Sequence, residues 1–311
     1  MSDLKTSLLS KIDLDKSHVK PYQGFIFLCG GHTDIRSPLP TSLRDAVYRE
    51  LAKNDDDEKR IRMAEHYKDW AHDSIYNDLV LFERHLAELS SLIVLVLESP
   101  GAIAELGLFS AIDEFREKLL VFIDSNYYKS SSFIKLGPVD FLEKTHKNTA
   151  EVHRWLIEKD NSLLFDGKLA EELQPELADA IRSRLSRSTS DHPFDRGQWL
   201  HYSLLICDLI DLLSALTIRE LRSILDGLKI IKSEHEIKQA LYLLEQVGLI
   251  AMEPKGDQRF YVAITGHQHL RLNYGDTAFD IDRFRLDALL EYQKSDKKRF
   301  RAIQEARRRY Q

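Results

Sequence analysis

The chain has 311 residues, of which 43% are hydrophobic, and its formal net charge is −6. A chain of this length can bury a large core and usually forms two domains. Its two cysteines, Cys29 and Cys207, lie far apart, which excludes a disulfide framework and a cysteine-based zinc site and fits a reducing compartment. The longest apolar run, residues 92–97, is too short to span a bilayer, and the N-terminus has no signal-peptide core. We therefore expect a soluble, cytoplasmic protein without a membrane segment.

The first predicted elements are a strand and two helices. The strand lies in GFIFLCGG, residues 24–31, an apolar run that ends in paired glycines. A helix is expected in SLRDAVYRELAK, after two prolines, and a longer one in IYNDLVLFERHLAELS. In the longer helix, Leu79, Phe82, Leu86 and Leu89 make one apolar face.

A second strand leads directly into a helix at SLIVLVLESPGAIAELG, residues 91–107. Its unbroken run of Val, Leu and Ile is typical of a central strand in a parallel sheet. Pro100 and Gly101 end the strand, Ser99 is the expected N-cap of the helix, and Glu105 lies in the first helical turns. Such a strand, turn and helix N-terminus form the usual ligand-binding corner of an open α/β sheet.

A third strand in KLLVFID, residues 118–124, completes an alternation of strands and helices. This order is typical of the α/β class with a doubly wound, mainly parallel sheet. We place this domain at residues 1–145 and a polar, mostly helical connector at residues 146–205. The rest of the chain, residues 206–311, is predicted to form a separate domain.

The last domain is predicted to be a winged helix-turn-helix. Ser233 caps a helix with an apolar stripe, Gly248 ends it, and two short strands follow around residues 255–257. A helix before this segment, in LTIRELRSIL, completes the pattern of two helices and a two-stranded wing.

Positive charge is concentrated at the C-terminal end. Residues 212–311 hold 18 Lys and Arg against 14 Asp and Glu, a net charge of +4, whereas the first 211 residues carry a net charge of −10. A terminal helix in KKRFRAIQEARRRYQ suits a phosphate backbone, although a solvated basic tail explains it equally well. The candidate nucleic-acid contacts are Lys232, Lys238, Lys255, Arg307, Arg308 and Arg309.

Three motifs carry a resemblance to a known family. The segments IFLCGG, YNDL and SPGAIAELG resemble the first strand, the mid-domain acidic motif and the catalytic corner of nucleoside deoxyribosyltransferase-like domains. Joined to a winged helix, such a domain resembles the effector proteins of bacterial retron antiphage systems. The form ESPGAIAELGLF is the most specific piece. The resemblance covers about the first 145 residues, and for the last hundred it is one of fold only.

The resemblance implies cleavage or transfer at an N-glycosidic bond, with Glu105 as the catalytic carboxylate. A carboxylate near the anomeric carbon can stabilise an oxocarbenium-like transition state or trap it covalently. Asp78 of YNDL matches the acidic residue that handles the departing base, and Asn77 stands beside it. Glu83 is a weaker candidate for this role than Asp78. It lies five residues further along the same predicted helix, so its side chain points about 140° away from that of Asp78.

The chain departs from the metabolic enzymes at two positions. Ser99 replaces an aspartate six residues before the glutamate, and Phe27 takes an aromatic position without a phenol, so we expect a related rather than an identical reaction. Ser99 can still hydrogen-bond a sugar hydroxyl, and Gly30 and Gly31 allow a ligand close to the backbone. Free amides at the helix end near Gly101 suit a pyrophosphate, which makes NAD a candidate substrate beside nucleosides and nucleotides.

The predicted partners follow from the same resemblance. An effector of this kind is held inactive by the retron reverse transcriptase and its small DNA-RNA hybrid molecule in an oligomeric assembly. The scattered histidines lack metal-ligand spacing and no complete G-x-G-x-x-G occurs, so we expect no metal and no bound cofactor. Two alternatives remain open: a DNA-binding regulator whose N-terminal domain only senses a nucleotide, and a structural scaffold with a degenerate pocket. The winged helix also suits protein contact with the reverse transcriptase.

Overall fold

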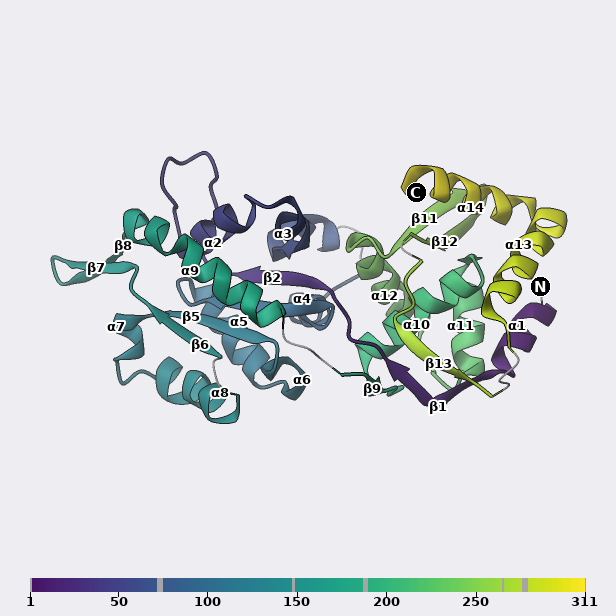
Figure 1. Ribbon diagram of the computed structural model, residues 1–311, viewed down its shortest axis with the longest axis horizontal. Helices are drawn as coiled ribbons and strands as arrows, with labels where there is room; N and C mark the ends of the chain where they lie inside the picture. Colours follow the sequence, from purple (N-terminus) through teal and green to yellow (C-terminus); the bar gives the residue numbers. More distant parts are fainter. Residues whose placement is uncertain are drawn as a thin grey trace. The chain divides into compact units, whose positions relative to one another are not determined.

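A computed structural model describes residues 2–71, 75–146, 149–186, 190–264, 266–275 and 279–310 (Figure 1). The chain folds into two compact units. The α/β unit consists of residues 23–68 and 80–188, and the terminal unit consists of residues 1–22, 69–79 and 189–311. No helix in the described part of the chain is long and apolar enough to cross a bilayer.

These units are discontinuous along the chain, unlike the predicted division at residues 145 and 205. Strand β1 (Ile12–Val19) pairs antiparallel with β13 (Leu270–Tyr274), so the N-terminus belongs to the terminal unit. The segment expected to be a connector supplies a strand and a long helix to the α/β unit. Local sequence patterns contain no signal for pairing between segments that lie so far apart.

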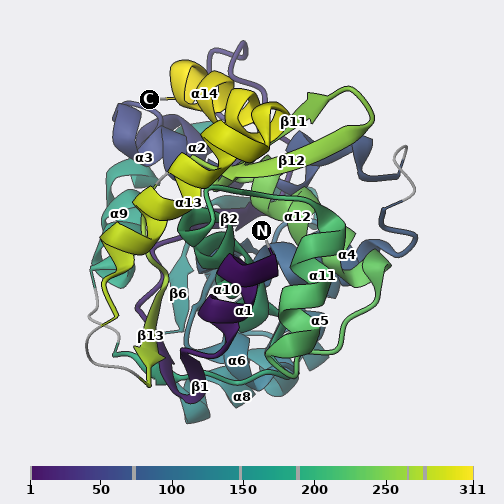
Figure 2. The same cartoon turned by 90° about the vertical axis from the view of Figure 1, so that its right-hand side faces the viewer.

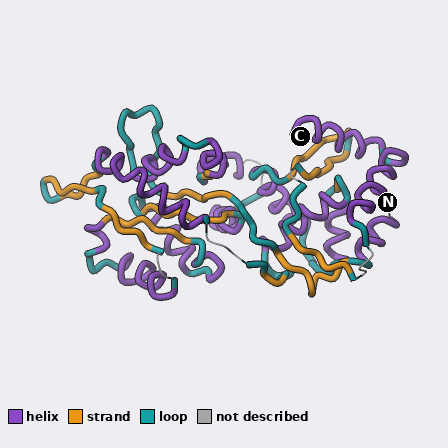
Figure 3. The backbone as a smooth tube through the Cα atoms, viewed as in Figure 1, coloured by secondary structure: helices purple, strands orange, loops and turns teal. Residues whose placement is uncertain are grey.

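The α/β unit is built on a five-stranded, fully parallel sheet with the order β3-β2-β4-β5-β6. Strands are drawn in orange in Figure 3. Its strands are β2 (Phe25–Cys29), β3 (Ile61–Arg62), β4 (Ser90–Val96), β5 (Leu119–Asp124) and β6 (Ala150–His153). The three predicted strands are confirmed as β2, β4 and β5. The sequence analysis missed β6, because this edge strand, AEVH, is short and polar.

Helices cover both faces of this sheet. On one face, α2 (Leu43–Leu51) and α9 (Gly167–Leu185) share a core with apolar side chains of β2, β4 and β5. On the other face, Phe27 of β2 packs against Phe109 of α5 (Pro100–Ser110), with the ring centroids 6.3 Å apart. The helices predicted after the first and the second strand are therefore confirmed as α2 and α5.

The remaining elements of the α/β unit are short. They are α3 (Asp55–Arg60), the 3-10 helix η1 (Ala64–Ala71), which runs into the terminal unit, α4 (Leu79–Glu88), α6 (Asp113–Arg116), α7 (Ser125–Tyr128), the π-helix η2 (Lys135–Val139), α8 (Asp140–Thr145), and the hairpin of β7 (Leu156–Lys159) and β8 (Ser162–Phe165). In α4 the apolar face is buried at Phe82 and Leu86, whereas Leu79 is 46% exposed.

The terminal unit combines two three-stranded sheets with six helices among its described residues (Figure 2). One sheet has the order β13-β1-β9, with β9 at His192–Pro193, and the other has the antiparallel order β10-β12-β11. The other elements are β10 (Ala215–Leu216), β11 (Ile250–Lys255), β12 (Gln258–Ala263), α1 (Ser2–Leu9), α10 (Trp199–Leu212), α11 (Ile218–Gly227), α12 (Glu234–Gln246), α13 (Ile281–Ser295) and α14 (Lys297–Tyr310).

The predicted order of helix, helix and hairpin is present in α11, α12 and β11-β12. Ser233 caps α12 as expected, through a capping box with Glu236, and Thr217 caps α11 in the same way with Glu220. Gly248, at φ 79°, follows α12 in the left-handed region that favours glycine. The predicted terminal helix is confirmed as α14, which packs with α13 over β10 and β12 (Figure 2).

Candidate functional site

The candidate site lies at the carboxyl ends of β2 and β4. Strand β2 has β3 on one side and β4 on the other, so the order of the strands reverses at this point of the sheet. Ligands of open α/β sheets bind in the crevice at such a switch point. Cys29 ends β2, Glu98 follows β4, and Glu105 lies on the helix that comes next.

Ser99 holds the turn between β4 and α5. Its Oγ accepts a hydrogen bond from the N–H of Ala102 at 3.2 Å and donates one to the carbonyl oxygen of Gly30 at 3.1 Å. The predicted N-cap is therefore confirmed. These two bonds use the donor and one of the two acceptor lone pairs of the hydroxyl, so a sugar hydroxyl can bind Ser99 only by donating to it.

Glu98 is a structural carboxylate that the sequence analysis missed. Its Oε1 accepts from the backbone N–H groups of Gly31 at 2.8 Å and Arg44 at 2.9 Å, and its Oε2 accepts from that of Leu43 at 2.7 Å. Burial raises the pKa of Glu98, and these three N–H groups oppose that rise. The carboxylate thus satisfies the amides at the N-terminus of α2, which are the groups that would otherwise attract a phosphate there.

The paired glycines make room for this arrangement. A Cβ on Gly31 would lie 2.8 Å from the Cβ of Ser42 and 3.0 Å from the Cδ of Glu98, and one on Gly30 would lie 2.8 Å from the Cβ of Arg44. The two contacts at 2.8 Å are closer than real Cβ atoms approach in folded proteins, and the one at 3.0 Å is tight. The close approach predicted for a ligand at this glycine pair is therefore made by the chain's own helix α2 and Glu98.

Glu105 projects from α5 into a partly buried, polar cluster. Burial raises the pKa of its carboxyl, and a hydrogen bond with the thiol of Cys29 and the charge of Arg44 lower it. Its Oε2 is buried without a hydrogen-bond partner among the described residues. A buried carboxylate oxygen without a donor is costly for the fold, and such costs concentrate at functional sites.

Glu83 is the second carboxylate of this cluster. Burial, and then the charge of Glu105, raise the pKa of Glu83 to about 7. The charges of both glutamates also raise the pKa of Cys29, after burial. Two neighbouring carboxyls are the usual arrangement for an acid and a nucleophile in glycoside chemistry. Glu83 thus has a claim to the acid role that the sequence analysis ranked below that of Asp78.

Arg44 and Glu65 complete the charged surroundings of Glu105. The side chain of Arg44 is only 8% exposed, and its Nη2 lies 2.5 Å from Oε1 of Glu65. The Nε of Arg44 is buried without a partner among the described residues. One cluster of described residues therefore holds a buried donor, Nε of Arg44, and a buried acceptor, Oε2 of Glu105, for which the described part of the chain supplies no partner.

The predicted site residues fall into both units. Gly30, Gly31, Ser99, Gly101 and Glu105 meet at the corner of β2, β4 and α5. Gly101 is exposed, and a Cβ added to it would meet nothing closer than 3.9 Å, so its backbone is open to a ligand. The remaining two, Asn77 and Asp78, are exposed and belong to the segment of the terminal unit that precedes α4.

Most of the candidate nucleic-acid contacts are paired with carboxylates of their own unit. The ion pairs are Lys232–Glu236 at 3.6 Å, Lys238–Glu234 at 2.7 Å, Arg309–Glu253 at 2.8 Å and Lys255–Glu305. Arg307 and Arg308 are exposed on α14. In the same helix, Arg299 is only 3% exposed and binds Glu220 at 2.7 Å, so part of the basic tail anchors α14 to α11.

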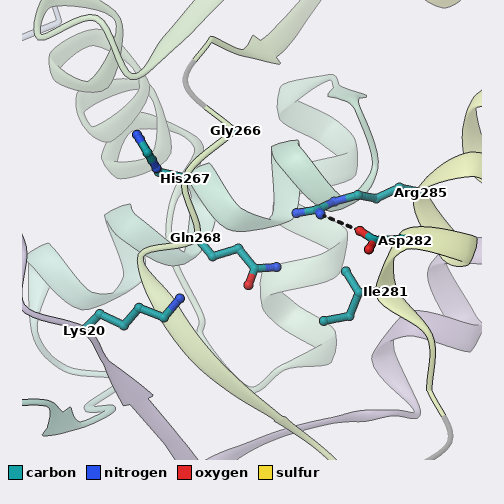
Figure 4. A pocket seen from close by; sticks show the side chains of 7 residues that line it. All are labelled: Lys20, Gly266, His267, Gln268, Ile281, Asp282 and Arg285. Carbon is teal, nitrogen blue, oxygen red and sulfur yellow. Dashed lines mark hydrogen bonds and ion pairs between the residues drawn. The ribbon is translucent and has the colours of Figure 1, made fainter.

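A separate polar cavity of about 460 Å³ lies in the terminal unit (Figure 4). It is lined by Lys20, Gly266, His267, Gln268, Ile281, Asp282 and Arg285. The guanidinium of Arg285 binds Asp282 at 3.3 Å and also pairs with Asp211. None of the predicted site residues lines this cavity, so it has no part in the chemistry of the Glu105 cluster.

Comparison with known proteins identifies the family. The family model described as "STM3845 retron effector protein" matches residues 40–252, more than half of the chain. Two similar proteins of Escherichia coli are named "Retron Ec86 putative ribosyltransferase/DNA-binding protein", 35% identical over 119 residues, and "Retron Ec73 putative ribosyltransferase/DNA-binding protein", 29% identical over 140 residues. The matches cover 38% and 43% of this chain and 37% and 43% of those relatives, less than half of either. This chain belongs to the STM3845 retron effector protein family.

Proposed function

We propose that this retron effector cleaves or transfers the N-glycosidic bond of a nucleoside, a nucleotide or NAD, with Glu105 as the catalytic carboxylate. The observation that carries the proposal is the buried Oε2 of Glu105, which has no hydrogen-bond partner among the residues that the structure describes, beside the strand ends where the sheet order reverses. The names of the two E. coli relatives include a ribosyltransferase activity. The proposed fold of this unit is that of the nucleoside deoxyribosyltransferases, supported by its parallel sheet and the SPGAIAELG corner.

The proposed reaction begins with departure of the base. As the bond to the base breaks, positive charge develops on the sugar, and the carboxylate of Glu105 stabilises it or forms a covalent ester with the anomeric carbon. Water or an acceptor nucleoside then takes the sugar, which gives hydrolysis or transfer. Burial raises the pKa of Glu105, and the thiol of Cys29 and the charge of Arg44 oppose this rise, in favour of the ionised form that this step needs.

The departing base requires a proton or a hydrogen bond. Glu83 suits this role, since a carboxyl with a pKa of about 7 is about half protonated near neutral pH. Asp78 is the candidate by family resemblance, with Asn77 as its neighbour. Substitution of each residue in turn separates the two assignments.

The exposed N-terminus of α5 is the proposed site for substrate phosphates. The backbone at Gly101 is open, whereas the equivalent end of α2 is filled by Glu98. A helix N-terminus attracts phosphate through its free amides and its dipole. This difference supports a substrate with a pyrophosphate, such as NAD, although nucleosides remain substrates to be tested.

The terminal unit is proposed to be a winged helix-turn-helix module that binds nucleic acid. Its α11 and α12, followed by the β11-β12 hairpin on β10, have the required order, and the E. coli relatives carry DNA-binding in their names. We propose that the retron reverse transcriptase and its small DNA-RNA molecule hold the effector inactive in an oligomeric assembly. Infection would release the activity as an antiphage defence.

The decisive experiment replaces Glu105 with Gln. The variant keeps the side-chain volume and removes the charge that the oxocarbenium ion needs, so we expect loss of base release and of phage defence with the fold retained. Purified protein is incubated with NAD, nucleosides and nucleotides, and released base is measured by chromatography. The control is Glu114→Gln, which removes an exposed carboxylate from helix α6. Full defence by a stably folded Glu105→Gln protein would leave the DNA-binding regulator as the better assignment.

A further inference from the structure

Helix α12 has one face toward the core of the terminal unit and one face directly opposite. An α-helix turns by about 100° per residue, so positions 237, 240 and 244 share one side and positions 235, 239 and 242 share the other. The core side is fully buried at Ile237, Ala240 and Leu244. The opposite side, which would face solvent if α12 lay on the surface, carries His235, Gln239 and Tyr242.

This opposite face is covered by residues 75 and 76 of the same unit. Gln239 and Tyr242 are only 5% and 8% exposed, and Tyr76 is only 1% exposed. The rings of Tyr76 and Tyr242 lie 6.2 Å apart, and the hydroxyl of Tyr76 donates to the carbonyl oxygen of Gln239 at 3.4 Å. Residues 75 and 76 therefore form a covering segment over the middle of α12.

The side-chain amide of Gln239, which is the polar group of this face, contacts other groups of the chain. The side-chain Nε2 of Gln239 donates to the carbonyl oxygen of Ile75 at 3.1 Å and lies 3.1 Å from Nε2 of His235. Glutamine amides are the groups that recognise base edges in the major groove. Here both N–H groups of that amide are directed at the chain itself.

Three cations lie near the start of α12. The charge and hydrogen bond of Lys238, and then the charges of Arg222 and Arg219, lower the pKa of Glu234 at the start of α12. Lys238 is 46% exposed, and both arginines are exposed on α11. Positive side chains beside a helix with base-reading groups are the chemistry that duplex nucleic acid recognises.

We propose that residues 75 and 76 mask the nucleic-acid-reading face of α12, and that duplex nucleic acid binds this face only after Tyr76 has been displaced. The proposal rests on the nucleic-acid function proposed for the terminal unit. In a helix-turn-helix the second helix enters the major groove, and α12 cannot do so while Tyr76 lies on it. The covered protein binds duplex with an affinity reduced by the fraction of molecules that are uncovered.

The test compares duplex binding by the full chain and its Tyr76 variants. A short fluorescent DNA duplex is titrated at low salt, and binding is followed by anisotropy. Tyr76→Ala removes the ring pair and should tighten binding by about tenfold. Tyr76→Leu keeps an apolar side chain in the covering segment, which protects the fold, and should tighten duplex binding by a smaller factor. The control Tyr127→Ala removes an exposed tyrosine of the α/β unit and should change nothing.

A second substitution tests whether the added affinity of Tyr76→Ala comes from duplex binding to α12. His235→Glu places a negative charge on the uncovered face, so in the Tyr76→Ala background it should abolish the added affinity. A gain that persists in this double variant would refute the mask, because the duplex would then bind elsewhere. Equal binding by the wild-type chain and both Tyr76 variants would refute the mask and leave the nucleic-acid function standing. Absence of binding by every variant would refute both.

Discussion

The substitution Glu98→Gln tests whether the carboxylate after β4 assembles the candidate site. Glu98 joins three segments, because its two oxygens accept from the backbone N–H groups of Gly31, Leu43 and Arg44. Gln has the same shape but only one acceptor oxygen. When that oxygen takes the place of Oε1, the bonds from Gly31 and Arg44 remain, and the amide NH₂ faces the N–H of Leu43.

The expected loss of stability follows from these contacts. One buried N–H without an acceptor costs about 1–3 kcal/mol. Loss of a negative charge at a helix N-terminus costs a further ~1 kcal/mol. Removing a buried charge offsets part of this, since burial raises the pKa of Glu98. The free energy of unfolding of the α/β unit should therefore fall by about 2 kcal/mol in Glu98→Gln, and by more in Glu98→Ala, which loses all three bonds.

Urea unfolding followed by circular dichroism measures this change, with Glu114→Gln as the control at an exposed position. The same samples are assayed for base release, because the start of α2 carries Arg44 beside Glu105. We expect a lower urea midpoint and weaker activity at temperatures where the variant is still folded. A Glu98→Gln protein with the stability of the control would show that these three hydrogen bonds do not hold the corner together.

Two further predictions concern the acid and the basic tail. Glu83 can donate a proton only while it is protonated, so base release should fall as the pH rises through about 7; this limb of the profile should vanish in Glu83→Gln and persist in Asp78→Asn. The opposite pattern, with the limb lost only in Asp78→Asn, would assign the acid role to Asp78. In the tail, reversal of the exposed Arg307 and Arg308 to Glu should weaken duplex binding and reduce its salt dependence by about one phosphate contact each, as a salt titration would show. Charge reversal of Lys238, which is already paired with Glu234, should change the salt dependence of duplex binding less. Equal salt dependence for all variants would exclude phosphate contacts by α14.

Local patterns were sufficient to predict the central strands, the corner at Ser99 and the capped helices. An unbroken run of branched apolar residues predicts β4 because a strand covered on both faces contacts only apolar neighbours. The caps at Ser99 and Ser233 were predictable because a cap depends on residues within one helical turn. The position of Glu105 at the corner follows from the same short segment.

Contacts between distant segments were decided by the tertiary structure alone. The pairing of β1 with β13, the parallel edge strand β6 and the covering of α12 by Tyr76 join residues far apart along the chain. The role of the glycine pair also differs from the prediction of a ligand contact, because the group that lies against it is Glu98, more than sixty residues away.

The choice of the acid that works with Glu105 also depends partly on sequence and partly on tertiary structure. From the sequence, Glu83 differs from Asp78 only by a rotation about the axis of its helix, and the motif favoured Asp78. The raised pKa of Glu83 depends on its burial beside Glu105, which lies on another helix. Sequence determines where a side chain stands on its own helix, whereas the solvent that it loses and the charges that it meets are set by the packing of helices against the sheet.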